Sequence, residues 1–213
     1  MEKVWLKHYP AGVPAEVKTD VYPSLIALIE ESFKKHRDLP AYKFMGKTIS
    51  FGQVDDLSRA FAAYLQGLGL ARGDRVAVMM PNVPQYPVVV AGILRAGYVV
   101  VNVNPLYTPR ELEHQLKDSG AKAIVLIELV AGPLQQVIDA VPTKKIVLAS
   151  MGDMLGMVKG ALVNYVVRHK KKMVPPFNLP GAVKFNDALG KGAGQSLPAT
   201  DIGPDDLAFM QYT

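Results

Sequence analysis

The run Arg75-Val76-Ala77-Val78-Met79-Met80 decides the fold class, because residues 76–80 form a continuous apolar stretch of strand length. Similar runs follow along the chain at 98–101, 123–127 and 145–149, and helical patterns separate them. Strands that are apolar at every position are buried on both faces, and strands that alternate with helices form parallel sheets. The sequence therefore predicts an α/β fold, with a layered, mostly parallel sheet flanked by helices.

Local signals mark where the helices begin. Ser50 with Gln53 and Thr108 with Glu111 have the spacing of capping boxes, in which two side chains satisfy free backbone N–H groups. Ser24 precedes another helical pattern, which predicts a helix over 24–37. These signals place helices directly before or after the apolar runs, as the α/β interpretation requires.

Three further features refine this order of elements. Residues 41–51 contain two short strand patterns around Met45-Gly46, which predicts a hairpin. Gly69 is expected to stop the helix that begins after Ser50, and Asn82 is expected to cap the helix that precedes Gly97.

The regular alternation of strands and helices stops after Ser150. Prolines and glycines become frequent, which indicates irregular or mobile chain as far as about 203, and a strand pattern resumes at 206–212. We therefore divide the chain into an α/β lobe at 1–150, an amphipathic, basic and Pro/Gly-rich segment at 151–203, and a final strand at 204–213.

Composition restricts the function classes. The chain of 213 residues has no cysteine, which excludes disulfides and thiol chemistry, and a net charge of +5, which favours anionic partners without choosing among them. The first residues lack the apolar core of a secretory signal, so a cytoplasmic protein is expected.

Several local patterns suggest chemistry but have simpler explanations. The glycines of 67–73 precede a strand and those of 190–196 lack a following Lys-Ser/Thr pair, so a turn and a flexible linker are the better interpretations. Glu111 and His114 share a helix face, but no further carboxylates with ligand spacing accompany them. We assign no metal site, and the list of catalytic residues is empty.

The segment 154–167 repeats apolar residues at helical spacing, and a basic cluster follows it directly, formed by Arg168, His169, Lys170, Lys171 and Lys172. The apolar part is too short to span a bilayer, whereas the cluster suits an anionic lipid surface. We predict peripheral membrane contact through Arg168, Lys170, Lys171 and Lys172. A helix packed on the domain with a solvated basic end is an equal alternative, and nucleic-acid binding is not expected.

Specific stretches carry a resemblance to a known family. The run 73–82, the run 92–97 and the run 104–112 resemble the adenylate-forming superfamily, which includes acyl-CoA ligases. The stretch 4–10 and the region 164–175 are similar to bacterial long-chain fatty acid-CoA ligases. The resemblance covers essentially the whole chain and implies an incomplete N-terminal domain of an adenylate-forming enzyme.

The resemblance also implies a reaction and a site. Residues 206–213 look like the strand that leads into the family's phosphate loop, so Thr213 would be the first loop residue and a nucleotide contact. The complete enzyme would use ATP, magnesium and CoA with a long-chain fatty acid, while this chain alone would be inactive and would bind none of them.

Two alternatives stay open. One is adenylation of another carboxylic acid or for another acceptor, since neither acyl-chain length nor oligomeric state can be read from these residues. The other is a stand-alone module that binds membranes or forms a homodimer.

Overall fold

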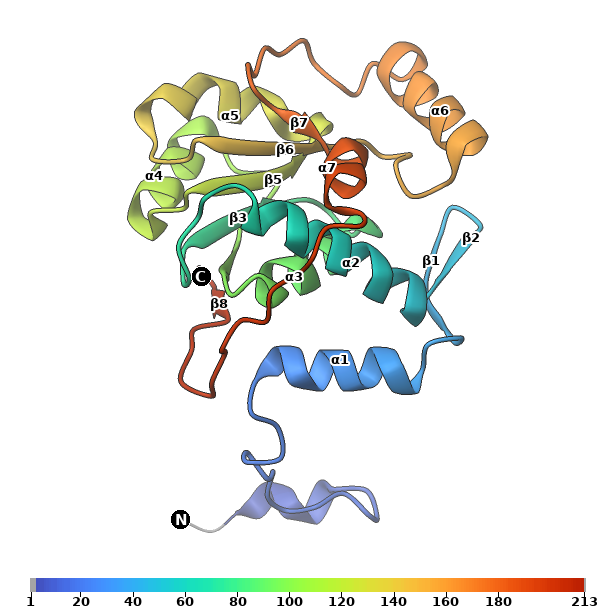
Figure 1. Cartoon of the computed structure of the whole chain (residues 1–213), viewed down its shortest axis with the longest axis vertical. Coiled ribbons are helices and arrows are strands. Elements are labelled where there is room, and N and C mark those ends of the chain that lie inside the picture. The colour runs from blue at the N-terminus through green and yellow to red at the C-terminus, as the bar shows by residue number, and fades with distance from the viewer. Residues whose placement is uncertain (1–2, 213) are drawn as a thin grey trace.

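The computed structural model describes residues 3–212 and contains a six-stranded parallel sheet (Figure 1). The strand order is β7-β6-β5-β3-β4-β8, and all five neighbouring pairs are parallel. The strands are β3 (Arg75–Met79), β4 (Val99–Asn102), β5 (Ala123–Ile127), β6 (Lys145–Ala149), β7 (Val183–Lys184) and β8 (Phe209–Met210). The predicted α/β fold with a mostly parallel sheet is confirmed.

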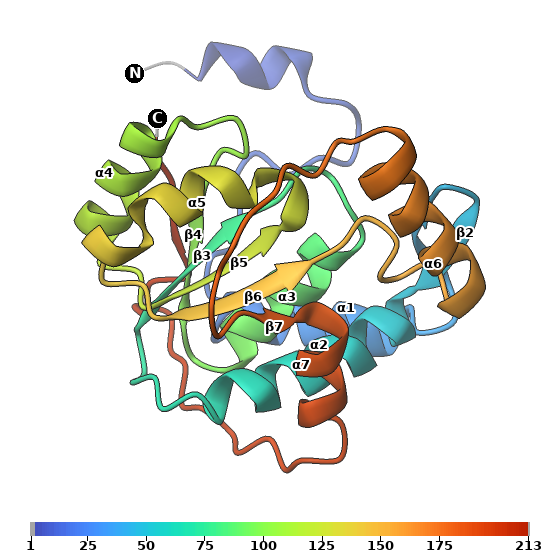
Figure 2. The same cartoon turned by 90° about the horizontal axis from the view of Figure 1, so that it is seen from above.

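Helices cover both faces of this sheet (Figure 2). One face packs against α2 (Phe51–Gln66), α3 (Gln85–Arg95) and α7 (Phe185–Gly192), with α1 (Leu25–Lys35) packed on α2 and α3, and the other face packs against α4 (Pro109–Ser119) and α5 (Ala131–Val137). Strand β3 divides its side chains between the faces: Val76 and Val78 point to the first, and Ala77 and Met79 to the second. The central strands are therefore predominantly apolar because both of their sides are buried.

The remaining elements lie outside the six-stranded sheet and its covering helices (Figure 1). They are the antiparallel hairpin of β1 (Pro40–Phe44) and β2 (Lys47–Ser50), helix α6 (Met157–Tyr165), the π-helical turn η4 (Val166–Lys170) and the 3-10 turns η1 (Val4–His8), η2 (Glu128–Val130) and η3 (Ile138–Ala140). The predicted hairpin is thus present.

Both predicted capping boxes form. The Ser50 side chain accepts a hydrogen bond from the Gln53 amide, and Gln53 accepts one from the Ser50 amide in return. Thr108 and Glu111 make the same reciprocal pair at the start of α4.

Some predicted boundaries are wrong. Asn82 does not cap α3, because that helix begins at Gln85, after Pro84. Helix α2 ends at Gln66, with Gly67 as its cap, so Gly69 is not its stop. Helix α6 begins at Met157, so the apolar residues Met154 and Leu155 lie outside it.

The segment expected to be irregular up to 203 contains β7 and α7, which is a further correction. Glycines 190 and 192, interpreted as parts of a flexible linker, lie within α7. Gly192 packs directly on α2, where a Cβ would overlap the carbonyl oxygen of Ala60. Close helix packing therefore explains this glycine. The sheet draws strands from all three predicted segments of the chain.

Helices α1, α2 and α3 are tied together by Arg95. Its side chain is 1% exposed and lies 2.5 Å from an Asp55 carboxylate oxygen and 2.9 Å from one of Glu30. The guanidinium also donates to Ser58 and lies 5.4 Å from the centre of the Phe33 ring. A buried charge needs such pairing, so this cluster fixes the angle between the three helices.

Candidate functional site

A polar cavity lies at the carboxyl ends of β3, β4 and β8. Ligands of open α/β sheets bind at this end of the strands, because the loops that follow parallel strands meet there. The cavity has a volume of about 410 Å³. Its polar lining comes from Asn82, Tyr86, Asn102, Asn104, Tyr107, Gln211 and Tyr212.

Asn102 is the centre of a hydrogen-bond chain along this edge. The Tyr86 hydroxyl donates to Asn102 Oδ1 at 2.8 Å, and Asn102 Nδ2 donates to Gln211 Oε1 at 2.9 Å. Gln115 of α4 donates to the Asn102 carbonyl oxygen at 2.8 Å. The chain connects α3, β4, α4 and the residue that follows β8, so it holds the end of β8 against the sheet.

Tyr212 is fixed by a second contact. Its hydroxyl donates to Asp118 at 2.6 Å, and burial together with the nearby carboxylate raises its pKa to about 12. Tyr212 is therefore a neutral donor at any physiological pH. Thr213, the predicted nucleotide contact, lies outside the described residues.

This cavity can form hydrogen bonds to a ligand, but its lining carries no charged side chain. None of its lining residues is Lys, Arg, Asp or Glu. Within residues 3–212, no group of three or more His, Asp and Glu side chains is arranged to hold a metal ion. The residues that line this cavity thus fit the uncharged parts of a ligand, and they supply no cation for phosphates.

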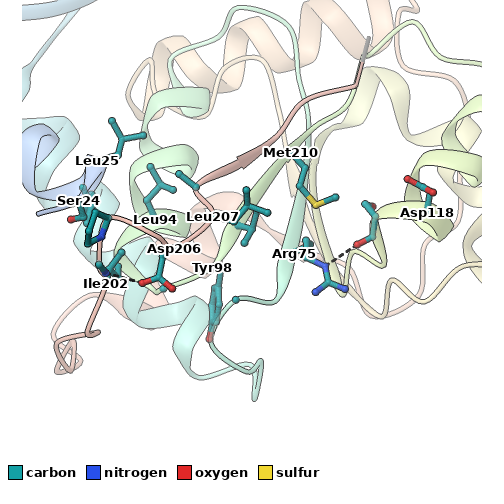
Figure 3. Close-up of a pocket in the computed structure, with 18 residues that line it drawn as sticks. Ser24, Leu25, Arg75, Leu94, Tyr98, Asp118, Ile202, Asp206, Leu207 and Met210 are labelled. Atoms are coloured by element: carbon teal, nitrogen blue, oxygen red, sulfur yellow. Dashed lines mark hydrogen bonds between the residues drawn. The ribbon is translucent and has the colours of Figure 1, made fainter. Parts of the chain in front are cut away.

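A larger cavity of about 550 Å³ lies at the opposite end of the same strands (Figure 3). Its lining includes Ser24, Tyr98, Leu207 and Met210, and Arg75 at its wall donates to the Ser119 carbonyl oxygen at 2.8 Å. Because it borders the amino-terminal ends of β3 and β4, we locate the candidate site at the polar cavity instead.

The predicted membrane residues separate into two groups. Arg168 is exposed but tied to the domain, since it donates to Glu128, whose side chain is 5% exposed, and to the Ser150 hydroxyl. Lys170, Lys171 and Lys172 are exposed. Over the part of the chain that is described, no helix is long and apolar enough to cross a bilayer. Membrane contact stays a prediction.

Sequence reasoning missed the hydrogen-bonded residues of the polar edge. Asn102 and Asn104 come at or after the end of an apolar strand, and Gln211 follows the last one. A polar amide directly after a buried strand is the available signal, because that position faces the ligand end of the sheet.

The fold and this polar edge are typical of a ligand-binding α/β domain, with the candidate site at the carboxyl ends of the strands. Residues 29–213 match the family model described as AMP-binding enzyme. The chain therefore belongs to the AMP-binding enzyme family, which confirms the resemblance to adenylate-forming proteins.

Curated relatives are similar over the whole chain. A long-chain-fatty-acid-CoA ligase of Escherichia coli O157:H7 is 53% identical over 214 residues, and the namesake from Haemophilus influenzae is 48% identical over the same length. Each alignment covers 100% of this chain and 38% of the relative. The chain thus spans about 38% of the length of the relatives it matches.

Solved structures agree with the fold. An anthranilate CoA ligase superposes with a TM-score of 0.72 at 18% identity, covering 92% of this chain and 34% of the other. A long-chain-fatty-acid-CoA ligase from Archaeoglobus fulgidus gives a TM-score of 0.69 at 19% identity, covering 96% and 37%. At such identities the superpositions support the fold alone.

Proposed function

We propose that this chain is part of a long-chain fatty acid-CoA ligase. The observation that carries the proposal is the similarity along all 213 residues to curated long-chain-fatty-acid-CoA ligases, at 53% identity to the one from Escherichia coli O157:H7. Adenylation of another carboxylic acid is the second candidate, because the fold alone, which an anthranilate CoA ligase shares, does not decide the acid.

The proposed reaction has two steps. The fatty carboxylate attacks the α-phosphorus of ATP, which forms the acyl-adenylate and releases pyrophosphate. The thiol of CoA then attacks the acyl carbon and AMP leaves, because AMP is a far better leaving group than hydroxide. Magnesium, when bound with ATP, would neutralise phosphate charge.

The described residues would position the nucleotide site and take no chemical step. Asn102 and Gln211 hold the end of β8, which leads directly to Thr213. In the complete protein, a phosphate loop beginning at Thr213 would offer backbone N–H groups and hydroxyls to ATP. The cation that phosphates require would come from residues beyond this chain, since the polar cavity has none.

Fatty acid-dependent pyrophosphate exchange tests the proposal. The complete protein is expected to exchange with long-chain fatty acids and to form acyl-CoA when CoA is added, whereas the 213-residue chain alone is expected to do neither. Short-chain and aromatic acids are the comparison substrates. Preference for an aromatic acid would favour the second candidate. Robust exchange by the isolated chain would refute the proposal that residues outside this chain are needed for the reaction.

Thr213→Ala in the complete protein tests the phosphate contact. Loss of one neutral hydroxyl is expected to cost about 0.5–1.5 kcal/mol of ATP binding, which weakens the site without abolishing it. A changed acyl-chain preference with unchanged ATP dependence would assign Thr213 to the acyl pocket instead.

We also propose a cytoplasmic location for the complete protein, in line with its soluble substrates ATP and CoA. A homodimer would require an apolar face that a second copy covers.

A further inference from the structure

Helix α6 exposes its apolar side chains and packs its small and polar ones inward. Met157, Val158, Leu162 and Tyr165 are 90%, 84%, 61% and 52% exposed. These positions lie on one side of the helix, because residues spaced by three, four or seven share a face. An ordinary surface helix has the reverse arrangement, with its large apolar residues in the core.

The inward face of α6 explains why the helix holds this orientation. Gly160 is buried against Gly152, where a Cβ on either glycine would overlap the backbone of the other. Asn164 accepts a hydrogen bond from the Gly152 amide at 2.7 Å. No large side chain fits between these backbones, so the bulky apolar residues of α6 face outward.

Contacts at both ends make α6 a fixed part of the surface. At its start, Lys159 donates to the Met45 carbonyl oxygen in the tip of the β1–β2 hairpin. Just beyond its end, Arg168 is paired with the buried Glu128 at 2.8 Å. Arg168 therefore anchors the segment, and the exposed lysines 170–172 follow the end of α6 within seven residues.

The sequence segment that carries α6 is basic, and the carboxylates beside it are the buried Glu128 and the part-buried Asp153. Residues 154–186 contain six Lys and Arg and no Asp or Glu, whereas the rest of the chain is close to neutral. An apolar helix face beside clustered lysines complements an anionic lipid surface, where the side chains insert among the acyl chains and the lysines contact headgroups.

The position of α6 separates it from the candidate nucleotide site. The helix connects β6 and β7 at one edge of the sheet, while β8 and the polar cavity lie at the opposite edge (Figures 1 and 2). We propose that the outward face of α6, together with Lys170, Lys171 and Lys172, docks on an anionic bilayer. This inference does not depend on the proposed reaction.

Vesicle cosedimentation of the complete protein tests this surface. The vesicles contain phosphatidylcholine alone or with 30% phosphatidylglycerol. Wild type is expected to bind the anionic vesicles and to be released by salt. Each lysine near such a surface is worth about fivefold in partitioning, so K170Q/K171Q/K172Q is expected to lower binding about 100-fold. M157S/L162S is expected to lower it about tenfold or more by removing apolar burial.

Matched controls come from exposed residues elsewhere on the surface. Lys18, Lys122 and Lys191 are exposed, so K18Q/K122Q/K191Q removes the same charge at other places. Val17 is 85% exposed, so Val17→Ser removes an apolar side chain outside α6. Binding within about twofold of wild type is expected for both controls.

Three results would overturn the proposal. Equal loss in the lysine triple and its control would mean that net charge alone drives binding. Unchanged vesicle binding in both α6 variants would mean that another part of the protein covers or replaces this face. A change from dimer to monomer in M157S/L162S, measured by analytical ultracentrifugation, without vesicle binding by wild type, would assign the face to a second copy.

Discussion

The packing of α7 on α2 allows a sharp test with two glycines of the same helix. A Cβ at Gly192 would overlap the Ala60 carbonyl oxygen and would lie 2.9 Å from the Tyr64 nitrogen, closer than ordinary contacts between heavy atoms. A Cβ at Gly190 would have no heavy atom within 4 Å. Gly192→Ala is therefore expected to destabilise the domain, and Gly190→Ala to leave it as stable or slightly more so.

The magnitudes follow from overpacking and helix propensity. Overpacking costs about 1–3 kcal/mol and occasionally more, while alanine is favoured over glycine in a helix by up to about 1 kcal/mol. Helix α7 has little freedom to move, because Phe185 and Ala188 are fully buried in the core. We expect Gly192→Ala to cost about 2 kcal/mol, or about 4–8 °C in Tm, and Gly190→Ala to add up to about 1 kcal/mol.

Urea unfolding followed by far-UV circular dichroism measures both effects. Fluorescence is a poor probe here, since the single tryptophan, Trp5, is 48% exposed near the N-terminus. The urea midpoint should fall for Gly192→Ala with an unchanged m-value. Equal destabilisation by both substitutions would show that glycine is needed for α7 itself, and a stable Gly192→Ala would refute the close contact with α2.

Three further predictions concern single side chains. Arg95→Met should lower the free energy of unfolding by about 3 kcal/mol in urea titrations, because Asp55 would keep its burial and lose its closest cation; a loss below about 1 kcal/mol would contradict this role. Burial raises the pKa of Asp153 to about 6, so the native state binds more protons than the unfolded state between about pH 4 and 6, and stability falls as pH rises through that window. Asp153→Asn should remove this slope and stabilise the protein above pH 6 by about 1–2 kcal/mol after allowance for solvent screening; a slope equal to that of wild type would exclude Asp153 as its source. Asn102→Ala in the complete protein should raise the KM for ATP several-fold with little change in the KM for fatty acid, because the loss of the bond to Gln211 frees the end of β8. Gln66→Ala is the control, since Gln66 donates to the Pro198 carbonyl oxygen away from the polar cavity. Equal changes in the two KM values, or the same rise in the KM for ATP in Gln66→Ala, would indicate a general loss of structure.

Elements with strong local signals could be predicted from the sequence. Strands β3, β5 and β6 each contain at least four consecutive apolar residues, and α2 and α4 begin at capping boxes whose partners are three residues apart. Such elements depend on interactions between near neighbours, so the residues that specify them are visible together in the chain.

Elements that exist only through distant partners were missed. Strand β7 has two residues and lacks any pattern of its own, because pairing with β6 defines it. The candidate site has the same property, since Asn102 and Gln211 meet across 109 positions of sequence.

Helix α6 shows most clearly what the sequence determined and what the tertiary structure decided. Its apolar periodicity and the basic cluster after it are properties of the sequence, and they led to the prediction of membrane contact. The direction of the apolar face was decided by tertiary structure alone. Gly152 and Gly160 let two backbones approach closely, and that close approach leaves no room on the inner side for the large residues of the helix.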